Sequence, residues 1–246
     1  MPGSFDRRIA LVTGGGGIGR ATAFAFAGEG AKLVIADFSE DAGDRVAREI
    51  VADGGEAVFV RTDVYSADDV AVSTYGRLDC AFNNAGIGDL GLPLHEITEE
   101  HWDHLLAANL KSVWLCMKYE IPQMRAQGGG ANVNTASQVG LFGKADAAAY
   151  VASKHGIVGL TRAAALENAA EGIRVNAVCP GIVDTGMGRK AVARDSGGVR
   201  QAAAGSLLGR AASPDEVAAG VLWLSSDTAS FVTGIAMPID AGATAR

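Results

Sequence analysis

Four consecutive glycines, residues 14–17, separate a short apolar run from an alanine-rich segment in the stretch ALVTGGGGIGRATA. The preceding residues, RIALVTG, predict a buried strand, and residues 20–29 predict a helix that Gly30 ends. Where glycines join a strand to a helix, backbone amides point outward and the helix dipole adds partial positive charge. Because no side chain stands in the way, a pyrophosphate can approach this turn. A plain flexible turn is the alternative interpretation.

The remaining apolar runs alternate with amphipathic segments. We predict helices that begin at the capping residues Ser39, Thr98 and Ser213, and a further helix over residues 147–170. Strands that alternate with helices indicate an α/β fold with a parallel sheet covered on both faces. A ligand is then expected beyond the carboxyl ends of the strands. The other predicted strands are at 31–37, 56–64, 78–86, 131–137, 173–180 and 234–240.

Composition argues against several other classes of protein. The 246 residues carry a formal net charge of -7 and no cluster of basic residues, so nucleic acid is not an expected partner. No apolar stretch is long enough for a membrane span, and we expect no signal peptide. The three cysteines, Cys80, Cys116 and Cys179, form no CxxC pair, so we expect reduced thiols in a cytoplasmic protein.

Asp37 ends the second predicted strand, 23 residues after Gly14. A carboxylate at this position can accept hydrogen bonds from both ribose hydroxyls of an adenosine half, and it repels a 2′-phosphate. The position therefore favours NAD over NADP as the cofactor. The alternative interpretation is that Asp37 only leads into the following helix.

Tyr150 and Lys154, in the segment YVASK, are four residues apart on a predicted helix and therefore share a face. A phenol titrates near ~10, and a nearby ammonium lowers that pKa because it favours the phenolate. The pair is thus suited to acid/base chemistry near neutral pH. Ser137, thirteen residues earlier and just past a strand, offers a hydroxyl to a substrate oxygen. Taken alone, a tyrosine–lysine pair at this spacing is more typical of a solvated helix face.

Five motifs, TGGGGIG, NNAG, NTAS, YVASK and CPGIVDT, occur in this order over nearly the whole chain. Together they resemble the short-chain dehydrogenase/reductase family. The resemblance implies a single Rossmann-like domain over residues 1–246, with a doubly wound sheet of about seven strands and a substrate lid around residues 186–210. It also implies a nicotinamide cofactor, hydride exchange between a secondary alcohol and a ketone, and a homotetramer built through residues 98–124 and 147–170.

The resemblance also assigns roles to individual residues. Tyr150 is the acid/base, and Lys154 lowers its pKa and contacts the nicotinamide ribose. Ser137 orients the carbonyl oxygen, and Asn109 holds a proton-relay water. Further cofactor contacts, besides Asp37, are implied for Gly14, Gly17, Ile18, Gly19, Asp63, Val64, Asn84, Ala85, Gly86, Pro180, Gly181 and Thr185.

The chain departs from the family pattern in three places. The glycine loop, usually TGxxxGIG, lacks one residue between Gly14 and Gly17, so its amides must be re-routed or the helix must start elsewhere. The connection between Asp63 and Gly76 is shorter than usual by about seven residues, or two helical turns, and we expect a short or distorted helix at 66–75. The late motif DGG reads DAG at 240–242, which a negative backbone φ at Ala241 accommodates.

The leading hypothesis is an NAD-dependent alcohol dehydrogenase or ketone reductase. We expect a cyclic or small secondary alcohol, ring diols included, because the residues predicted around the substrate are mostly small and apolar. A 3-oxoacyl-thioester reductase is the alternative, and Asp37 argues against it because such reductases generally use NADPH. A protein that binds NAD(H) without turnover is the hypothesis of a different class. No metal is expected, and His101 and His104 are interpreted as helix-surface residues, not metal ligands.

Overall fold

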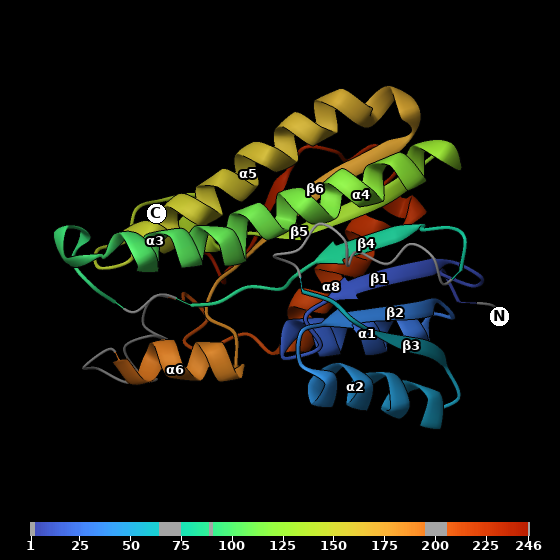
Figure 1. Cartoon of the computed structure of the whole chain (residues 1–246), viewed down its shortest axis with the longest axis horizontal. Coiled ribbons are helices and arrows are strands. Elements are labelled where there is room, and N and C mark those ends of the chain that lie inside the picture. The colour runs from blue at the N-terminus through green and yellow to red at the C-terminus, as the bar shows by residue number, and fades with distance from the viewer. Residues whose placement is uncertain (1–2, 64–74, 89–90, 195–205, 246) are drawn as a thin grey trace.

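The computed structural model describes residues 3–63, 75–88, 91–194 and 206–245. Within these ranges, seven strands form one parallel sheet in the order β3-β2-β1-β4-β5-β6-β7 (Figure 1). This arrangement confirms the predicted α/β fold with a doubly wound parallel sheet. The strands are β1 (Ile9–Thr13), β2 (Lys32–Asp37), β3 (Glu56–Arg61), β4 (Cys80–Asn83), β5 (Gly130–Thr135), β6 (Ile173–Pro180) and β7 (Ala236–Ile239).

Helices lie on both sides of the sheet, as Figure 1 shows. One side carries α3 (Glu99–Leu106), α4 (Ser112–Ala126) and α5 (Ala148–Asn168). The other side carries α1 (Ile18–Gly28), α2 (Glu40–Ala52) and α8 (Pro214–Ser225), while α6 (Gly186–Arg194) lies apart from both layers.

Successive residues of β1 pack into two separate hydrophobic cores. Ala10 and Val12 belong to the core shared with α1, α2 and α8, whereas Ile9 and Leu11 belong to the core shared with α4 and α5. Because both faces of β1 are buried, its residues from Ile9 to Val12 are all apolar and do not alternate with polar ones. The strand order reverses between β1 and β4, and sheets of this kind bind ligands outside the carboxyl ends at that point.

Local sequence signals predicted the helix starts well. The side chains of Ser39 and Thr98 each accept a hydrogen bond from the first turn of their helix, at 3.3 and 3.2 Å. Ser213 and Glu216 form the predicted capping box at the start of α8. These starts depend on residues within one helical turn, so the sequence pattern is enough to predict them.

Several predicted segments differ in the structure, among them the strand predicted at 78–86, which is β4 at Cys80–Asn83, and the strand predicted at 56–64, which ends at Arg61. α1 begins at Ile18, so the predicted start at Arg20 was wrong, since the shortened glycine loop enters the helix earlier. The helix predicted from Thr98 toward Met124 contains a π-helical turn, Ala107–Lys111, between α3 and α4. The cofactor contact predicted for Val64 and nearly all of the helix expected at 66–75 lie outside the described residues.

The described residues contain neither a helix suited to a membrane span nor a cluster of metal-binding side chains. In the ranges given above, no helix combines the length and apolar character required to cross a membrane. The same ranges contain no group of three or more His, Cys, Asp or Glu side chains arranged to bind a metal ion. Cys80, Cys116 and Cys179 are all buried free thiols.

Candidate active site

The carboxyl ends of the central strands bring the predicted motifs to one edge of the sheet. In Figure 1 the arrows of β1 and β4 point toward the side of the molecule on which α6 lies. The glycine loop follows β1, Asn84 follows β4, Ser137 comes after β5, and Gly181 follows β6. Segments far apart in the sequence therefore meet at this edge.

The glycine loop excludes a side chain at two positions. A Cβ atom at Gly19 would lie 1.8 Å from the carbonyl oxygen of Gly14, and one at Gly17 would lie 2.8 Å from Cγ2 of Thr185. Gly17 also has a φ of 51°, in the left-handed region that favours glycine. The loop thus packs backbone against backbone on one side and against Thr185 on the other.

Asn84 connects the ends of three strands. Its Nδ2 donates to the carbonyl oxygens of Thr13 and Gly14 at 3.2 and 3.4 Å, and its Oδ1 accepts from Thr135 Oγ1 at 3.4 Å. The Thr13 hydroxyl accepts from the backbone N–H groups of Asn84 and Ala85 at 2.9 and 3.1 Å. Sequence reasoning missed Thr13 and Thr135, because their partners lie 71 and 51 residues away in the chain.

Asp37 lies at the carboxyl end of β2 and contacts the glycine loop. Its Oδ2 accepts from the backbone N–H of Gly15 at 2.6 Å, and its Oδ1 accepts from that of Ser39 at 2.8 Å. Directly after the neighbouring strand β3, the N–H of Thr62 donates to the carbonyl oxygen of Asp37 at 3.0 Å, and Asp63 follows. The structure therefore brings the ends of β2 and β3 and the glycine loop together.

Lys154 is buried on α5, between β5 and Tyr150. Its Nζ donates to the carbonyl oxygen of Thr135 at 2.8 Å and lies 5.5 Å from the centroid of the Tyr150 ring. Only 4% of the lysine is exposed. Burial lowers the pKa of Lys154 from 10.5 to about 8, and the nearby Cys179 opposes this shift. The structure thus places Lys154 close to Tyr150, with the lysine buried away from water.

Ser137 stands at the start of a short 3-10 helix (Gln138–Gly140) that packs against α5. Its Oγ accepts a backbone hydrogen bond from this turn at 3.3 Å, and the residue is half-buried. A Cβ atom at Gly140 would lie 2.8 Å from the carbonyl oxygen of Lys154. The turn that carries Ser137 therefore touches α5 one helical turn after Tyr150.

Asn109 lies in the π-helical turn and is fully buried. Its Oδ1 accepts from the backbone N–H of Ile87 at 2.8 Å, and its Nδ2 donates to the carbonyl oxygen of Ile87 at 3.0 Å. A Cβ atom at Gly86 would lie 2.9 Å from Asn109 Oδ1 and 3.9 Å from Lys154 Nζ. Asn109, the loop after β4 and the buried lysine are therefore neighbours.

The segment after β6 crosses this edge of the sheet. Pro180 ends β6, and a Cβ atom at Gly181 would lie 3.0 Å from the backbone of β7's end. Thr185 then contacts the glycine loop, as described above. Met187, in the first turn of α6, reaches the loop after β4, since a Cβ atom at Gly88 would lie 3.5 Å from its Cγ. The start of α6 thus extends from the glycine loop to the β4 loop.

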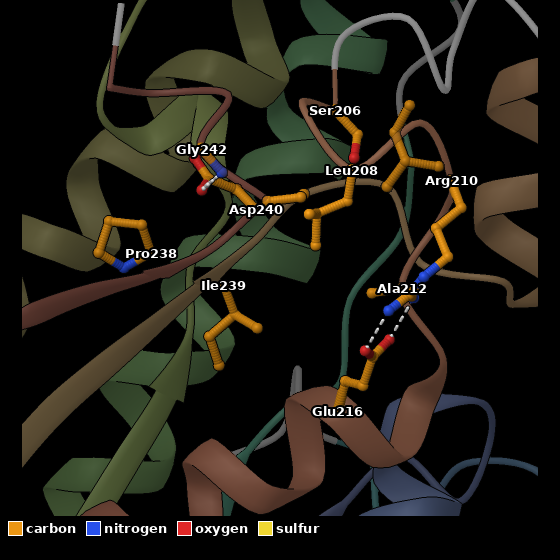
Figure 2. Close-up of a pocket in the computed structure, with 12 residues that line it drawn as sticks. Ser206, Leu208, Arg210, Ala212, Glu216, Pro238, Ile239, Asp240 and Gly242 are labelled. Carbon is orange, nitrogen blue, oxygen red and sulfur yellow. Dashed lines mark hydrogen bonds and ion pairs between the residues drawn. The ribbon is translucent and has the colours of Figure 1, made fainter.

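A pocket of about 270 Å³ lies between the ends of β6 and β7 and the segment that leads into α8, and Figure 2 shows residues that line it. Arg210 and Glu216 face each other on one side of it, with Nη2 2.6 Å from Oε1. Gly181 lines the pocket, whereas its described lining residues include none of the four predicted catalytic residues. The pocket therefore adjoins the predicted site at Gly181 and is separate from the tyrosine–lysine pair.

Ala241, which lines this pocket, does not have the negative φ at which alanine would suffice in the DAG motif. Its φ is 52°, in the left-handed region. A residue with a Cβ atom adopts that conformation at a cost of roughly 1–2 kcal/mol, because the Cβ atom crowds the following carbonyl oxygen. Sequence reasoning failed here because nothing in the three letters DAG reports the backbone angle.

Ala241→Gly is expected to raise the free energy of unfolding by about 1 kcal/mol, because glycine adopts a positive φ without this crowding. Urea denaturation measures the change. Ala243→Gly, two residues along and without a positive φ, is the matched control and is expected to lower stability by about 0.5–1 kcal/mol. Equal destabilisation by both substitutions would contradict the strain assigned to Ala241.

The family described as enoyl-(acyl carrier protein) reductase matches residues 12–244 of the chain. A short-chain dehydrogenase/reductase of Aspergillus oryzae is 41% identical over 97% of this chain and 95% of its own length. Cis-4-hydroxycyclohexanecarboxylate dehydrogenase of Sinomonas cyclohexanicum is 43% identical over 100% of both chains. The crystal structure of levodione reductase is similar with a TM-score of 0.92 and 36% identity, over 98% of this chain and 99% of that chain. On its motifs, its fold and these relatives, the chain belongs to the short-chain dehydrogenase/reductase family.

Proposed function

We propose that the protein is an NAD-dependent oxidoreductase that interconverts a secondary alcohol and its ketone. The observation that supports this most directly is the buried ammonium of Lys154, 5.5 Å from the ring centroid of Tyr150 and next to the turn that carries Ser137. A buried cation favours the ionised form of a neighbouring phenol. This arrangement suits proton exchange with an alcohol oxygen near neutral pH.

The residues present fit a nicotinamide dinucleotide. The glycine loop leads into the N-terminus of α1, where backbone N–H groups and the helix dipole favour a diphosphate, and a Cβ atom at Gly16 would meet no atom within 4 Å, so the loop is open at that position. The bound cofactor accepts or supplies the hydride. The residues that we propose to hold it are Gly14, Gly17, Ile18, Gly19, Asp37, Asp63, Val64, Asn84, Ala85, Gly86, Tyr150, Lys154, Pro180, Gly181 and Thr185.

Each catalytic residue has a defined role in this proposal. Tyr150 takes the proton from the alcohol oxygen in oxidation and returns it in reduction, and Ser137 donates a hydrogen bond to the same oxygen. Lys154 stabilises the phenolate and contacts the nicotinamide ribose. Asn109 holds a water that relays the proton. An amide has two N–H groups and two acceptor lone pairs, so Asn109 has capacity for that water besides Ile87.

NAD is proposed as the cofactor because of Asp37. Gly15 and Ser39 each use one acceptor site of its carboxylate, and a carboxylate offers about four. The remaining sites suit the two ribose hydroxyls of NAD, whereas the charge opposes the phosphate of NADP.

Asp37→Ala is expected to lower the ratio of kcat/KM with NAD to kcat/KM with NADP by about tenfold or more, because hydrogen bonds to a charged group contribute about 1.5–3 kcal/mol. Parallel assays of reduced-cofactor absorbance measure this ratio. Asp41→Ala, on the exposed first turn of α2, is the control and leaves the ratio unchanged. If the ratio for Asp37→Ala equals that of the control, Asp37 does not select the cofactor.

We propose the substrate class from the names of the relatives and from the mostly small, apolar residues that the sequence predicts around the substrate. The relative from Sinomonas cyclohexanicum is named for oxidation of a ring-borne secondary alcohol. We therefore place cyclic secondary alcohols and ring diols first, small acyclic diols second and 3-oxoacyl thioesters third. A panel of these three classes, assayed with NAD and NADP in parallel, ranks them by kcat/KM.

Titration of the protein with NADH, followed by cofactor fluorescence, separates the enzyme from a protein that binds without turnover. Binding together with turnover of any member of the panel supports the enzyme. Binding without turnover across the whole panel supports the second hypothesis, and absence of binding removes both.

We further propose one domain over residues 1–246 with a substrate lid around residues 186–210, of which 195–205 lie outside the described residues, in a cytoplasmic homotetramer. Large apolar side chains are exposed on the helices proposed to form the subunit contacts: Trp102 is 37% exposed, Trp114 44% and Leu166 86%. Such side chains favour an interface with another copy. Light scattering tests this assembly, and a monomeric mass would contradict it.

A further inference from the structure

A cluster of polar side chains is buried between the sheet and the helices α4 and α5. Glu120 of α4, Asn83 of β4, Asn132 and Asn134 of β5, and Thr161 of α5 are each at most 1% exposed. We call these residues the Glu120 cluster. No part of the proposed reaction uses them. Buried polar groups are costly unless their hydrogen bonds are satisfied, so each contact in the cluster matters.

Hydrogen bonds connect the whole cluster. Glu120 Oε2 accepts from Asn83 Nδ2 at 3.0 Å and from Asn132 Nδ2 at 2.5 Å. Asn83 Nδ2 also donates to Asn134 Oδ1 at 3.0 Å, and Asn134 Nδ2 donates to Thr161 Oγ1 at 3.0 Å. Asn83 and Asn134 are direct partners in the β4–β5 register. The chain of bonds therefore runs from α4 through two strands to α5.

Two oxygens in this cluster have no hydrogen-bond partner among the described residues, Glu120 Oε1 and Asn83 Oδ1. Both belong to side chains that already bond to each other through their other atoms. A carboxylate and an amide oxygen are both acceptors, so neither can satisfy the other. A proton on Glu120 Oε1 would turn this oxygen into a donor, and the acceptor Asn83 Oδ1 belongs to the side chain that already bonds to Glu120 Oε2 at 3.0 Å.

The surroundings also disfavour a charge on Glu120. It is buried without an ion pair to any described basic residue, and burial raises its pKa from 4.5 to about 7. Its neighbours on β4 and β5 are neutral amides, and its neighbour on α5 is the Thr161 hydroxyl through Asn134. The titratable group that interacts with it is Cys116 on α4, a buried thiol whose pKa lies well above 9.0.

We propose that Glu120 is a neutral carboxylic acid that donates its proton to Asn83, and that this acid–amide pair is a positioning device for Lys154. Two connections lead from the pair to that lysine. Asn134 directly precedes Thr135, whose carbonyl oxygen accepts from Lys154 Nζ at 2.8 Å. Thr161 lies seven residues after Lys154 on the same helix, about two turns away.

The acid–amide pair therefore fixes both the strand that accepts from the ammonium and the helix that carries it. The protonation half of the proposal is independent of turnover. The positioning half rests on the proposed function, so the two halves are tested by different measurements.

Infrared spectroscopy of the unmodified protein, with carbon-13-labelled glutamate, tests the protonation directly. At pH 6 exposed carboxylates are ionised, and Glu120 should give a protonated-carboxyl band that titrates at a pH of about 7. Glu120→Gln should lose this band, whereas Glu100→Gln, an exposed position on α3, should keep it. A spectrum without the band at pH 6 overturns the proposal, and it does so without needing any variant to fold.

The pH dependence of stability gives an independent test. Between pH 4.5 and about 7 the folded protein keeps the Glu120 proton that the unfolded chain has lost, so stability falls as the pH rises. Across that interval the unfolding equilibrium constant should rise, relative to that of Glu120→Gln, by about tenfold for each pH unit. A constant ratio between the two proteins over this range would overturn a neutral Glu120.

Variants of the cluster test the positioning half. Glu120→Gln keeps a donor for Asn83 Oδ1 and an acceptor for the Asn83 and Asn132 amides, so below pH 7 its kcat should remain within about twofold of that of the unmodified protein. Glu120→Ala leaves the Asn132 amide without its acceptor and removes one acceptor of the Asn83 amide, and Thr161→Val removes the last bond of the chain with little change of shape.

Thr161→Val keeps the test available if Glu120→Ala does not fold. In either variant, if it folds, kcat should fall by about tenfold and the pH at which kcat is half-maximal should shift. The affinity for NADH should change less. A folded Thr161→Val protein with the pH–rate profile of the unmodified enzyme would overturn the positioning role, whatever the infrared result.

Discussion

Tyr150→Phe is expected to lower kcat by about 10²–10⁴-fold while the protein still binds reduced cofactor. The phenol oxygen is the one atom removed, and it is the proposed proton acceptor for the substrate alcohol. The Lys154 ammonium stays in its hydrogen bond to Thr135 at 2.8 Å, so the site around the missing hydroxyl should remain intact. Steady-state kinetics with the best substrate of the panel measures kcat, and NADH fluorescence measures cofactor affinity.

Tyr119→Phe provides the matched control, because Tyr119 lies on α4 outside the proposed site. Its kcat should equal that of the unmodified protein. An active Tyr150→Phe variant would refute the assignment of the acid/base. Loss of NADH binding in the same variant would instead indicate that the tyrosine serves the cofactor site.

Lys154→Met is expected to lower kcat/KM by about 10²-fold or more, and, unlike Tyr150→Phe, to weaken cofactor binding as well. The substitution keeps much of the apolar stem and removes the charge that lies 5.5 Å from the Tyr150 ring centroid. It also removes the proposed contact to the nicotinamide ribose. Separate measurement of kcat and of the KM for NAD distinguishes these two losses, and an unchanged KM for NAD would contradict the ribose contact.

The same variant has a distinct pH dependence of stability. Burial lowers the pKa of Lys154 from 10.5 to about 8, so between these values the unfolded chain holds a proton that the folded protein has released. The free energy of unfolding should therefore rise from pH 8 to 10.5, by about 3 kcal/mol at about 1.36 kcal/mol per pKa unit. Lys154→Met should lack this rise in guanidinium unfolding experiments, and parallel curves for the two proteins would contradict the buried ammonium.

The parts of the fold that sequence reasoning predicted depend on local rules. Hydrophobic runs bounded by glycine predicted the strands, and capping chemistry predicted the helix starts at Ser39, Thr98 and Ser213. The motif order led to the family and hence to the candidate residues. The failures concern backbone geometry: α1 starts earlier than predicted, and Ala241 has a positive φ. The backbone angles at these positions depend on how the flanking segments pack against the rest of the protein, which the local sequence does not report.

The contacts of the candidate site were largely beyond sequence reasoning. The bonds of Asn109 to Ile87 join residues 22 apart, and those of Asn84 to Thr13 join residues 71 apart. No periodicity relates such positions. The Glu120 cluster was missed for the same reason, because a glutamate in an amphipathic helix gives no sign that two asparagine amides will bond to it.

By itself, the sequence determined the order of strands and helices, the family, and which residue types were available for proton exchange and dinucleotide binding. Only the tertiary structure decided how those residues are paired, how deeply Lys154 and Glu120 are buried, and where the backbone closes on the glycine loop. The physical reason is one of range. Propensity, capping and hydrophobic periodicity act within a few residues, whereas burial and the pKa shifts that it causes arise only when distant segments exclude water together.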